Sequence, residues 1–465
     1  MTMLRSDHQE KYYQLSTQYE FFSFEDFHIE ITPTLLQCTY DFNLGGAFYF
    51  HPRIKIAHKP LYANWKAGNP EDEMLRNLCF HIGMVELISY WKTACPKQLI
   101  VKPYHLDDDQ IEWWKNLYFL GLGEFFYLNG LALNKAEFMH ISSGEAALHP
   151  AHIDLSNDYI VPVGGGKDSA VSLEILKTMG ALTPLLQNPR GAMLDTLQAA
   201  GIALEDSIEI QRTLDPGLLS CNAMGFLNGH TPFSALLAFQ SLLCAYLSGK
   251  RNIALSNESS ANEATIPGTD INHQYSKSFA FESDFREYYS RYISNDFNYF
   301  SFLRPLSELQ IAQLFSKFPQ HHYSFRSCNA GSKTDSWCGK CPKCLFAWLI
   351  MSPFLGEQKL AEIFGNRLLD DPDMLFFLKQ LMGKTIEKPF ECIGTTNEVN
   401  LSLFLIWKKN IQNPPMLLKQ LKAEGLIQEF TAAEVEHFFH RMETPHFLSE
   451  AEITLIQQHI TCPEY

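Results

Sequence analysis

Three consecutive glycines followed by a lysine, an aspartate and a serine form the segment of this chain with the clearest chemical potential. The segment reads Gly164-Gly165-Gly166-Lys167-Asp168-Ser169. It joins an apolar, strand-like run at 159–163 to a run that is typical of a helix. Glycines in such a turn let backbone N–H groups surround an anion, and the N-terminus of a helix adds the positive end of its dipole. The turn therefore predicts a binding site for an anion, such as the phosphates of a nucleotide.

Two common phosphate-binding loops do not fit this segment. A Walker A loop requires serine or threonine directly after its lysine, whereas Asp168 follows Lys167. The spacing of the dinucleotide fingerprint, G-x-G-x-x-G, is also absent from it. A glycine-rich turn that binds no ligand is the alternative interpretation.

The same segment resembles the pyrophosphate loop of the N-type ATP pyrophosphatases, whose pattern is S-G-G-x-D-[ST]. Gly164 stands where that family usually has serine, so one hydroxyl donor is missing. The resemblance implies that the loop binds the pyrophosphate part of ATP and that ATP is cleaved to AMP and pyrophosphate. It also implies that Asp168 lies near Mg²⁺ and that Lys167 contacts a phosphate.

Four cysteines form a second group, and their spacing is that of a metal site. They are Cys328, Cys338, Cys341 and Cys344, in a C-x9-C-x2-C-x2-C array. Four thiolates suit tetrahedral Zn²⁺, and such a site would be structural because the protein fills every coordination position. An iron–sulfur cluster is an alternative, although the array lacks the C-x3-C-P continuation of the bacterial ferredoxin sequence. Free thiols without a metal are the other alternative.

Polar residues follow a later strand of the predicted sheet. Asn257 and Glu258 come directly after the strand predicted at 252–256. Polar loops at strand ends often carry function, so we expect both residues to help bind the nucleotide. Arg304 is a further candidate for contact with a carboxylate or phosphate, and Ser307 is positioned to cap a helix.

The overall pattern predicts an α/β protein with a doubly wound parallel sheet, and the resemblance of the loop implies that the sheet is of the adenine nucleotide α-hydrolase-like type. Residues 1–150 alternate apolar and polar residues as strands do, which predicts an N-terminal α+β domain. Residues 151–350 alternate strands and helices and would form the pyrophosphate-loop domain with the four cysteines. Residues 351–465 predict a helical C-terminal region. Ligands bind at the carboxyl ends of strands in such sheets, so the glycine turn and residues 256–258 should meet there.

The composition describes an ordinary globular protein of two or three domains, with 465 residues, of which 46% are hydrophobic and 19% charged. A net charge of −15 argues against a large nucleic-acid-binding face. Residues 1–14 do not have the features of a signal peptide, and the longest apolar run, 234–248, is too short to span a bilayer. We therefore expect a cytoplasmic protein without membrane insertion, whose eleven cysteines stay reduced.

Six segments together are similar to one family, the ATP-dependent epimerases of UDP-N-acetylmuramoyl-L-alanyl-L-glutamate in bacterial peptidoglycan synthesis. The segments are 161–169, 255–258, 272–278, 303–309, 337–344 and 388–392. The resemblance implies that the substrate is the UDP-muramoyl dipeptide and that its terminal L-Glu is converted to D-Glu. The implied route is an acyl-adenylate, with Mg²⁺ present and with release of AMP and pyrophosphate. No protein partner is predicted.

Epimerisation by this route needs one or two positioned bases to move the α-proton. The candidates are His273, Lys277 and His230, which lie in polar segments before predicted helices, and Cys392 is a weaker one. A single histidine in such a loop is nevertheless more often a surface or structural residue.

Two other functions stay open from the sequence. One is a different adenylating enzyme of the pyrophosphate-loop class, forming an amide or a nitrile, as in the synthesis of the queuosine precursor. The other is a zinc-dependent RNA-binding protein that uses the four cysteines as a knuckle. The acidic charge and the lack of a basic, aromatic stripe weigh against RNA binding.

Overall fold

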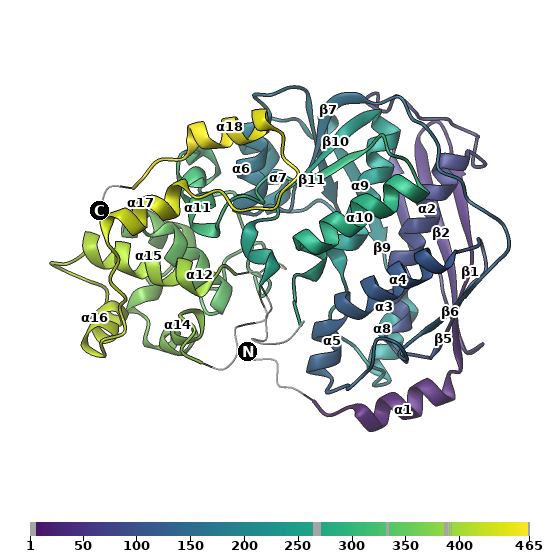
Figure 1. The fold of residues 1–465 in the computed structure, drawn as a ribbon, viewed down its shortest axis with the longest axis horizontal. Coiled ribbons are helices and arrows are strands. Elements are labelled where there is room, and N and C mark those ends of the chain that lie inside the picture. The colour runs from purple at the N-terminus through teal and green to yellow at the C-terminus, as the bar shows by residue number, and fades with distance from the viewer. Residues whose placement is uncertain are drawn as a thin grey trace.

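The computed structural model describes residues 6–263, 271–331, 334–385, 389, 391 and 393–463. A single eleven-stranded sheet runs through it, in the order β11-β10-β7-β8-β9-β4-β2-β1-β5-β6, with β3 paired to β2 (Figure 1). The strands are β1 (Phe21–Ile31), β2 (Leu35–Leu44), β3 (Phe48–Phe50), β4 (Arg53–Ala57), β5 (Gln98–Val101), β6 (His140–Ser143), β7 (Ser156–Pro162), β8 (Leu182–Gln187), β9 (Ile208–Thr213), β10 (Lys250–Leu255) and β11 (Asn298–Ser301).

Helices connect and cover these strands. The first half contains α1 (Gln9–Gln18), α2 (Glu73–Glu86), α3 (Ile88–Trp91), α4 (Asp108–Gly121), α5 (Gly123–Leu128), α6 (Lys167–Leu176), α7 (Ala192–Ala199), α8 (Pro216–Ala223) and α9 (Phe233–Ser248). The second half contains α10 (Phe279–Tyr292), α11 (Glu308–Ser316), α12 (Pro342–Met351), α13 (Glu357–Phe364), α14 (Leu375–Leu381), α15 (Thr396–Lys409), α16 (Met416–Ala423), α17 (Ala432–His440) and α18 (Glu450–His459). Short 3₁₀ helices include η2 (Ser259–Asn262) and η3 (Tyr275–Lys277).

The strands β7 to β11 form an all-parallel half of the sheet. Their spatial order, β11-β10-β7-β8-β9, is that of a doubly wound sheet, in which the chain first builds outward from β7 and then returns to its other side. The switch point therefore lies between β7 and β10. This arrangement confirms the expected α/β class with a mostly parallel sheet, while the adenine nucleotide α-hydrolase-like type stays a prediction.

Successive residues of the central strands face two different hydrophobic cores, because side chains alternate between the two faces of a strand. Ile160 of β7 and Ile253 of β10 pack in one core with residues of α9 and α10. Val161 and Ala254, the next residues along, pack in the other core with residues of α6 and α11. Helices thus cover both faces of the parallel half, and each buried strand is apolar on both sides.

The N-terminal strands extend the same sheet. β4 pairs antiparallel with β9, with Ile56 opposite Ile210, and β2 and β1 continue outward from β4. The join therefore crosses the boundary expected near residue 150. One sheet therefore carries residues from both sides of that boundary. The division of the chain into three domains stays a prediction.

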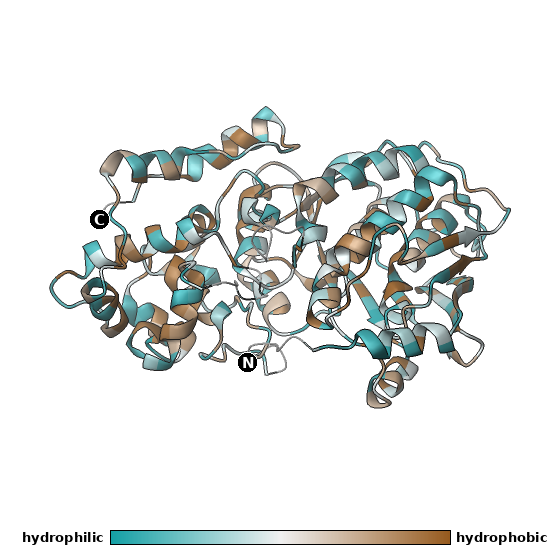
Figure 2. Ribbon diagram, turned by 60° about the horizontal axis from the view of Figure 1, so that its bottom comes forward, coloured by the Kyte–Doolittle hydropathy of each residue, from teal (hydrophilic) through white to brown (hydrophobic). Residues whose placement is uncertain are grey.

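The C-terminal helices pack on the core that contains α6 and α11, at the end of the molecule opposite to β1 and β2 (Figure 1). Hydrophobic residues, brown in Figure 2, concentrate in the strands and inner helices, whereas the outer helices show many hydrophilic residues. Within the described residues, no helix is long and apolar enough to cross a membrane.

Helix α11 begins with the cap that was expected at Ser307, and the structure shows that this cap is a capping box with Gln310. The Ser307 hydroxyl accepts a hydrogen bond from the Gln310 N–H at 3.2 Å, and the Gln310 side chain accepts one from the Ser307 N–H at 2.9 Å. This reciprocal pair satisfies two N–H groups that a helix start leaves open. It also fixes the position of Glu308, the first residue of the helix.

Candidate functional site

A cavity of about 350 Å³ lies at the carboxyl ends of β7, β8 and β10. Its walls come from the glycine turn after β7, the segment after β10, and parts of α9, α11 and α12. The volume falls within the usual range for small-molecule sites, and the place is the switch point where doubly wound sheets bind ligands. Seven of the eight residues expected to bind the nucleotide line it: Gly164, Gly166, Lys167, Asp168, Ser169, Asn257 and Glu258.

Gly165 is the eighth residue that was expected to bind the nucleotide, and it determines the shape of the turn. Its φ of +78° lies in the left-handed region, and a Cβ there would lie 2.8 Å from the backbone of Ala192 and Met193. Only glycine therefore allows the turn to approach α7 so closely. The Gly165 carbonyl accepts a hydrogen bond from the Arg326 N–H at 2.8 Å, which holds the turn from its other side.

The other two glycines face open space. No heavy atom lies within 4 Å of a Cβ built on Gly164 or Gly166. Among the described residues, none accepts a hydrogen bond from the N–H groups of Gly164, Gly165 or Gly166. Gly166 is also the N-cap of α6, where no side chain caps the helix. The turn thus offers unsatisfied donors and a helix N-terminus to an anion.

Ser169 and Asn257 are positioned by hydrogen bonds with the protein. The Ser169 hydroxyl donates to the Gly166 carbonyl at 3.0 Å. The Asn257 side-chain amide donates to the Ser301 hydroxyl at 3.1 Å, which ties the segment after β10 to β11. Both side chains stabilise the loops that form the cavity wall.

Three carboxylates and one ammonium group meet at the base of the turn. The Lys167 ammonium pairs with Asp168 and with Glu308, and it is buried. Carboxylate oxygens of Asp168, Glu258 and Glu308 lie within 4.8 Å of one another. The sequence pattern does not single out Glu308, because a glutamate that follows a capping serine is common in the first turn of any helix.

The buried position changes the protonation of this group. Burial raises the pKa of Glu308, and Asp168 and Glu258 raise it further, whereas Lys167 acts in the opposite direction. Burial alone would lower the pKa of Lys167, but Asp168 and Glu308 outweigh burial and raise it. A raised pKa favours the neutral form of Glu308, and a divalent cation bound among the three carboxyl groups would favour the charged form instead. Oxygen donors of this kind suit Mg²⁺ and Ca²⁺.

Arg304 lies outside the cavity, and the carboxylate that it contacts belongs to the protein itself. Its guanidinium is fully buried and pairs with Glu282 at 2.8 Å. It also donates to the carbonyls of Glu258, at 2.8 Å, and Lys277, at 2.5 Å. Arg304 therefore anchors two segments of the cavity wall, and Glu282 supplies its carboxylate partner.

The three candidates for proton transfer lie in two places. Lys277, at the end of η3, lines the cavity. His230 and His273 instead meet at the buried Glu124, near the start of α5. Glu124 has no signal in the sequence, since it belongs to an apolar helix far from both histidines along the chain. Cys392, the weaker candidate, and Lys388 lie outside the described residues.

The four cysteines converge. Their sulfur atoms lie within 4.8 Å of one another, with separations of 3.4 Å for Cys341–Cys344, 3.7 Å for Cys338–Cys344 and 3.8 Å for Cys328–Cys341. Sulfurs about 2.3 Å from a tetrahedral Zn²⁺ would lie about 3.8 Å apart. Backbone N–H groups of Gly331 and Cys344 donate to two of these sulfurs. The donor set and its geometry therefore fit a tetrahedral metal ion.

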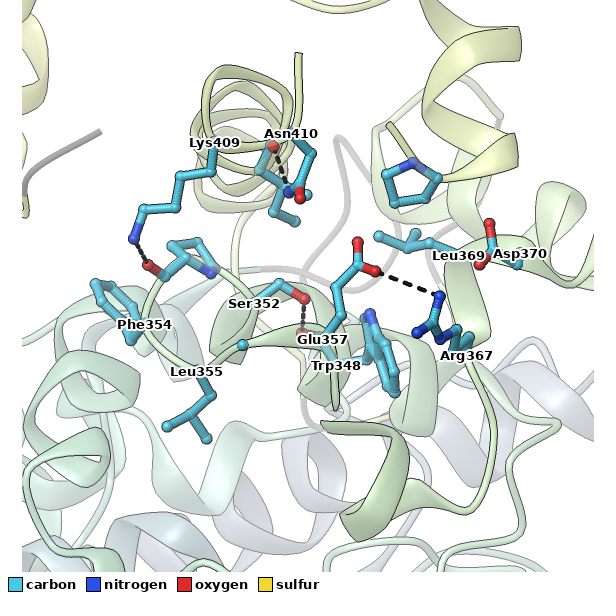
Figure 3. A pocket seen from close by; sticks show the side chains of 14 residues that line it. Trp348, Ser352, Phe354, Leu355, Glu357, Arg367, Leu369, Asp370, Lys409 and Asn410 are labelled. Carbon is cyan, nitrogen blue, oxygen red and sulfur yellow. Dashed lines mark hydrogen bonds and ion pairs between the residues drawn. The ribbon is translucent and has the colours of Figure 1, made fainter. Parts of the chain in front are cut away.

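A second cavity, of about 140 Å³, lies among the C-terminal helices (Figure 3). Its charged groups already pair with the protein, since Arg367 lies 3.8 Å from Glu357 and the Lys409 ammonium donates to the Pro353 carbonyl at 2.5 Å. The smaller volume and the paired charges make it a weaker candidate for a ligand site than the cavity at the glycine turn.

The fold and the site define a mixed α/β protein with a cavity at the switch point of a mostly parallel sheet. Comparison with models of known protein families identifies the family of this chain. The model of the MurL N-terminal domain matches residues 14–302, and that of the MurL C-terminal domain matches residues 324–435. The chain belongs to the MurL family, and with it to the amino-acid epimerases, which are isomerases.

Curated relatives share the family over most of their length. A protein of Xanthomonas oryzae pv. oryzae is 36% identical over 70% of this chain and 74% of its own. Relatives from Salinispora tropica and a Micromonospora species are 33% and 34% identical, over 74% and 69% of this chain and 77% and 72% of their own. All three are named UDP-N-acetyl-alpha-D-muramoyl-L-alanyl-L-glutamate epimerase. No solved structure matches the chain.

Proposed function

We propose that the protein epimerises the terminal L-Glu of UDP-MurNAc-L-Ala-L-Glu to D-Glu in peptidoglycan synthesis. The reaction consumes ATP and water, passes through an acyl-adenylate, and releases AMP and pyrophosphate. The names of the relatives support the substrate. The observation that carries the ATP-dependent route is the open glycine turn beside Lys167 and three clustered carboxylates, because this set suits a nucleotide with its divalent cation.

Activation of the carboxylate explains the need for ATP. The α-proton beside a free carboxylate is hard to remove, because the carbanion would add a second negative charge next to the first. Adenylation removes the charge of the carboxylate and lets the electron pair pass into the acyl carbonyl. The α-proton can then leave and return to the opposite face, and hydrolysis gives the D-Glu carboxylate and AMP.

Each part of the cavity has a role in this scheme. The N–H groups of Gly164 and Gly166 and the N-terminus of α6 would hold phosphate oxygens. Lys167 would pair with a phosphate in exchange for a carboxylate. Asp168, Glu258 and Glu308 would hold Mg²⁺, which supplies positive charge where negative charge develops on the phosphates. Lys277 stands on the cavity wall as one candidate for proton transfer.

We also propose that Cys328, Cys338, Cys341 and Cys344 hold a structural Zn²⁺. The four sulfurs already have separations close to those of a tetrahedral site. The following helix, α12, begins at the cluster, with Cys341 as its N-cap. The metal would therefore fix the start of a helix that lines the cavity.

The test is substrate-dependent exchange of labelled pyrophosphate into ATP, combined with resolution of L-Glu from D-Glu in the product. The wild-type protein should catalyse both. Asp168→Asn should lower the exchange by about 100-fold or more, since it removes one of the clustered charges. The matched control is Asp154→Asn, because the Asp154 side chain is fully exposed. Absence of exchange in the wild-type protein with this substrate would reject the adenylation route.

A further inference from the structure

Three segments that are far apart in the sequence place an acid and two imidazoles together. Glu124 belongs to α5, His230 precedes α9, and His273 precedes η3. The Nδ1 atom of His230 lies 3.3 Å from the Oε2 atom of Glu124, and the Nδ1 atom of His273 hydrogen bonds to the same oxygen. The centres of the two rings are 4.8 Å apart. This group lies outside the lining of the ATP cavity described above.

The contacts with Glu124 favour the tautomer of each imidazole that carries its proton on Nδ1. The Glu124 side chain is only 5% exposed, so its carboxylate needs hydrogen-bond donors from the protein. An Nδ1–H group that donates to a carboxylate leaves the Nε2 atom of the same ring free of a proton in the neutral form, and so able to accept one. The same carboxylate stabilises the imidazolium that forms when Nε2 takes a proton.

A buried lysine, Lys92, lies near Glu124 and the two histidines and adds a positive charge to this group. The Lys92 ammonium donates to the carbonyl of Gly229, the residue before His230. Burial lowers the pKa of Lys92 to about 8, and the negative charge of Glu124 acts in the opposite direction. A positive group at this place offsets the charge of Glu124 and disfavours a divalent cation beside it. The cluster is thus better suited to proton transfer than to metal binding.

The two histidines are connected to the cavity by short stretches of chain. His230 lies three residues before Phe233, and His273 lies four residues before Lys277, and both of these later residues line the cavity. Three or four residues span at most about 10 to 14 Å. The backbones of His230 and His273 therefore lie within about 14 Å of residues that line the cavity. The His230 and His273 side chains are 25% and 15% exposed, so neither ring is fully enclosed by the protein.

We propose that Glu124 is a positioning residue that holds His273 as the base that removes the α-proton, with His230 beside it. This inference rests on the proposed function. The C–H bond at the α-carbon breaks, its proton passes to Nε2 of His273, and the electron pair passes into the acyl carbonyl to give an enolate. A proton from a second donor, for which Lys277 stands on the cavity wall, forms the new C–H bond on the opposite face.

The test separates carboxylate activation from proton transfer. Pyrophosphate–ATP exchange and D-Glu formation are measured for the wild-type protein, Glu124→Gln, Glu124→Asp and His273→Gln. Glu124→Gln and His273→Gln should keep the exchange within about 3-fold and lose D-Glu formation by about 100-fold or more. The ratio of the rate with protiated substrate to the rate with α-deuterated substrate should be larger in Glu124→Gln than in the wild-type protein, because proton removal has become slower. Glu124→Asp should recover part of the rate.

Glu112→Gln is the matched control, since Glu112 is a surface residue of α4 that pairs with Lys135. D-Glu formation near the wild-type rate in Glu124→Gln would overturn this inference and leave the proposed function standing. Loss of both reactions in Glu124→Gln with an intact fold would also overturn it. A metal ion present beyond the one in the cysteine cluster, and lost in both Glu124→Gln and His273→Gln, would identify a metal site instead. Lack of exchange in the wild-type protein rejects the proposed function itself.

Discussion

Buried ionic side chains in this protein each have defined partners, and the partners explain their positions. Arg304 pairs with Glu282 in the core, whereas Lys167 pairs with Asp168 and Glu308 at the edge of a cavity. Burial of a charge is costly unless such partners are present. The difference between the two sites is access: a ligand can compete for Lys167, but the Arg304 guanidinium is only 1% exposed.

A neutral histidine in the larger core predicts a dependence of stability on pH. The Nδ1 atom of His81 hydrogen bonds to the Asn77 carbonyl at 2.8 Å, and its Nε2 atom to the Tyr288 hydroxyl at 3.0 Å. Burial lowers the pKa of His81 from 6.5 to about 4. Because the unfolded chain binds this proton first, stability is present above about pH 6.5 and is lost as the pH falls toward 4.

The expected loss from His81 alone is about 2 kcal/mol between pH 7.5 and pH 5. Urea unfolding of the wild-type protein and His81→Gln at both pH values measures it, since all other titrating groups are common to the two proteins. The variant should lose about 2 kcal/mol less than the wild-type protein over this range. Equal losses in both proteins would show that His81 does not remain neutral in the folded state.

A segment that lies far from the glycine turn in the sequence holds the turn in place. The segment between α11 and α12 carries Cys328, Cys338 and Cys341, and Cys344 follows in the first turn of α12. This segment makes one contact with the turn and one with α7. The Arg326 N–H donates to the Gly165 carbonyl at 2.8 Å. The Asp335 carboxylate accepts a hydrogen bond from the Ala192 N–H, at the start of α7, at 3.0 Å. The cysteine cluster thus supports both the turn and the helix against which the turn packs.

Removal of the metal should therefore weaken nucleotide binding, although no cysteine lines the cavity among the described residues. We expect about one equivalent of zinc in the wild-type protein and a loss of about 10-fold or more in ATP affinity after chelation, or in Cys341→Ser. Metal analysis and isothermal titration measure the two quantities. Cys462→Ser is the matched control, because Cys462 is exposed. Less than half an equivalent of metal, or unchanged affinity without it, would contradict the expectation.

At the scale of the whole molecule, the cavity lies between two hydrophobic cores. Leu237 of α9 packs against the core that includes the N-terminal strands. Phe346 of α12 belongs to the core of the C-terminal helices. A ligand between them contacts side chains that belong to both cores.

Nucleotide binding should therefore stabilise both sides together. At a concentration 100 times its dissociation constant, a ligand adds about 2.7 kcal/mol to the stability of the folded state. Hydrogen–deuterium exchange with and without Mg-ATP should show slower exchange in both α9 and α12. The outer helix α17 serves as the internal reference, with little change expected. Slower exchange on only one side of the cavity would place the nucleotide elsewhere.

Local patterns in the sequence predict many of the strands and helices in the parallel half of the sheet. The strand, turn and helix around Gly165 were predictable, because glycine spacing and apolar periodicity act over a few residues. The cap at Ser307 was predictable for the same reason. Glu124 and Glu308 were not, because their partners lie far away along the chain. The antiparallel join of β4 to β9, with Ile56 opposite Ile210, is also a long-range pairing that no local pattern encodes.

The three glycines of the turn differ in how much change each can accept. Gly165 is constrained by a left-handed φ and by the backbone of α7. Gly164 has neither constraint, and a side chain there would enter open space. A serine at position 164 could therefore add one hydroxyl donor for a phosphate without any change in the surrounding backbone. Evolution or a protein engineer can adjust the affinity for phosphate at this position.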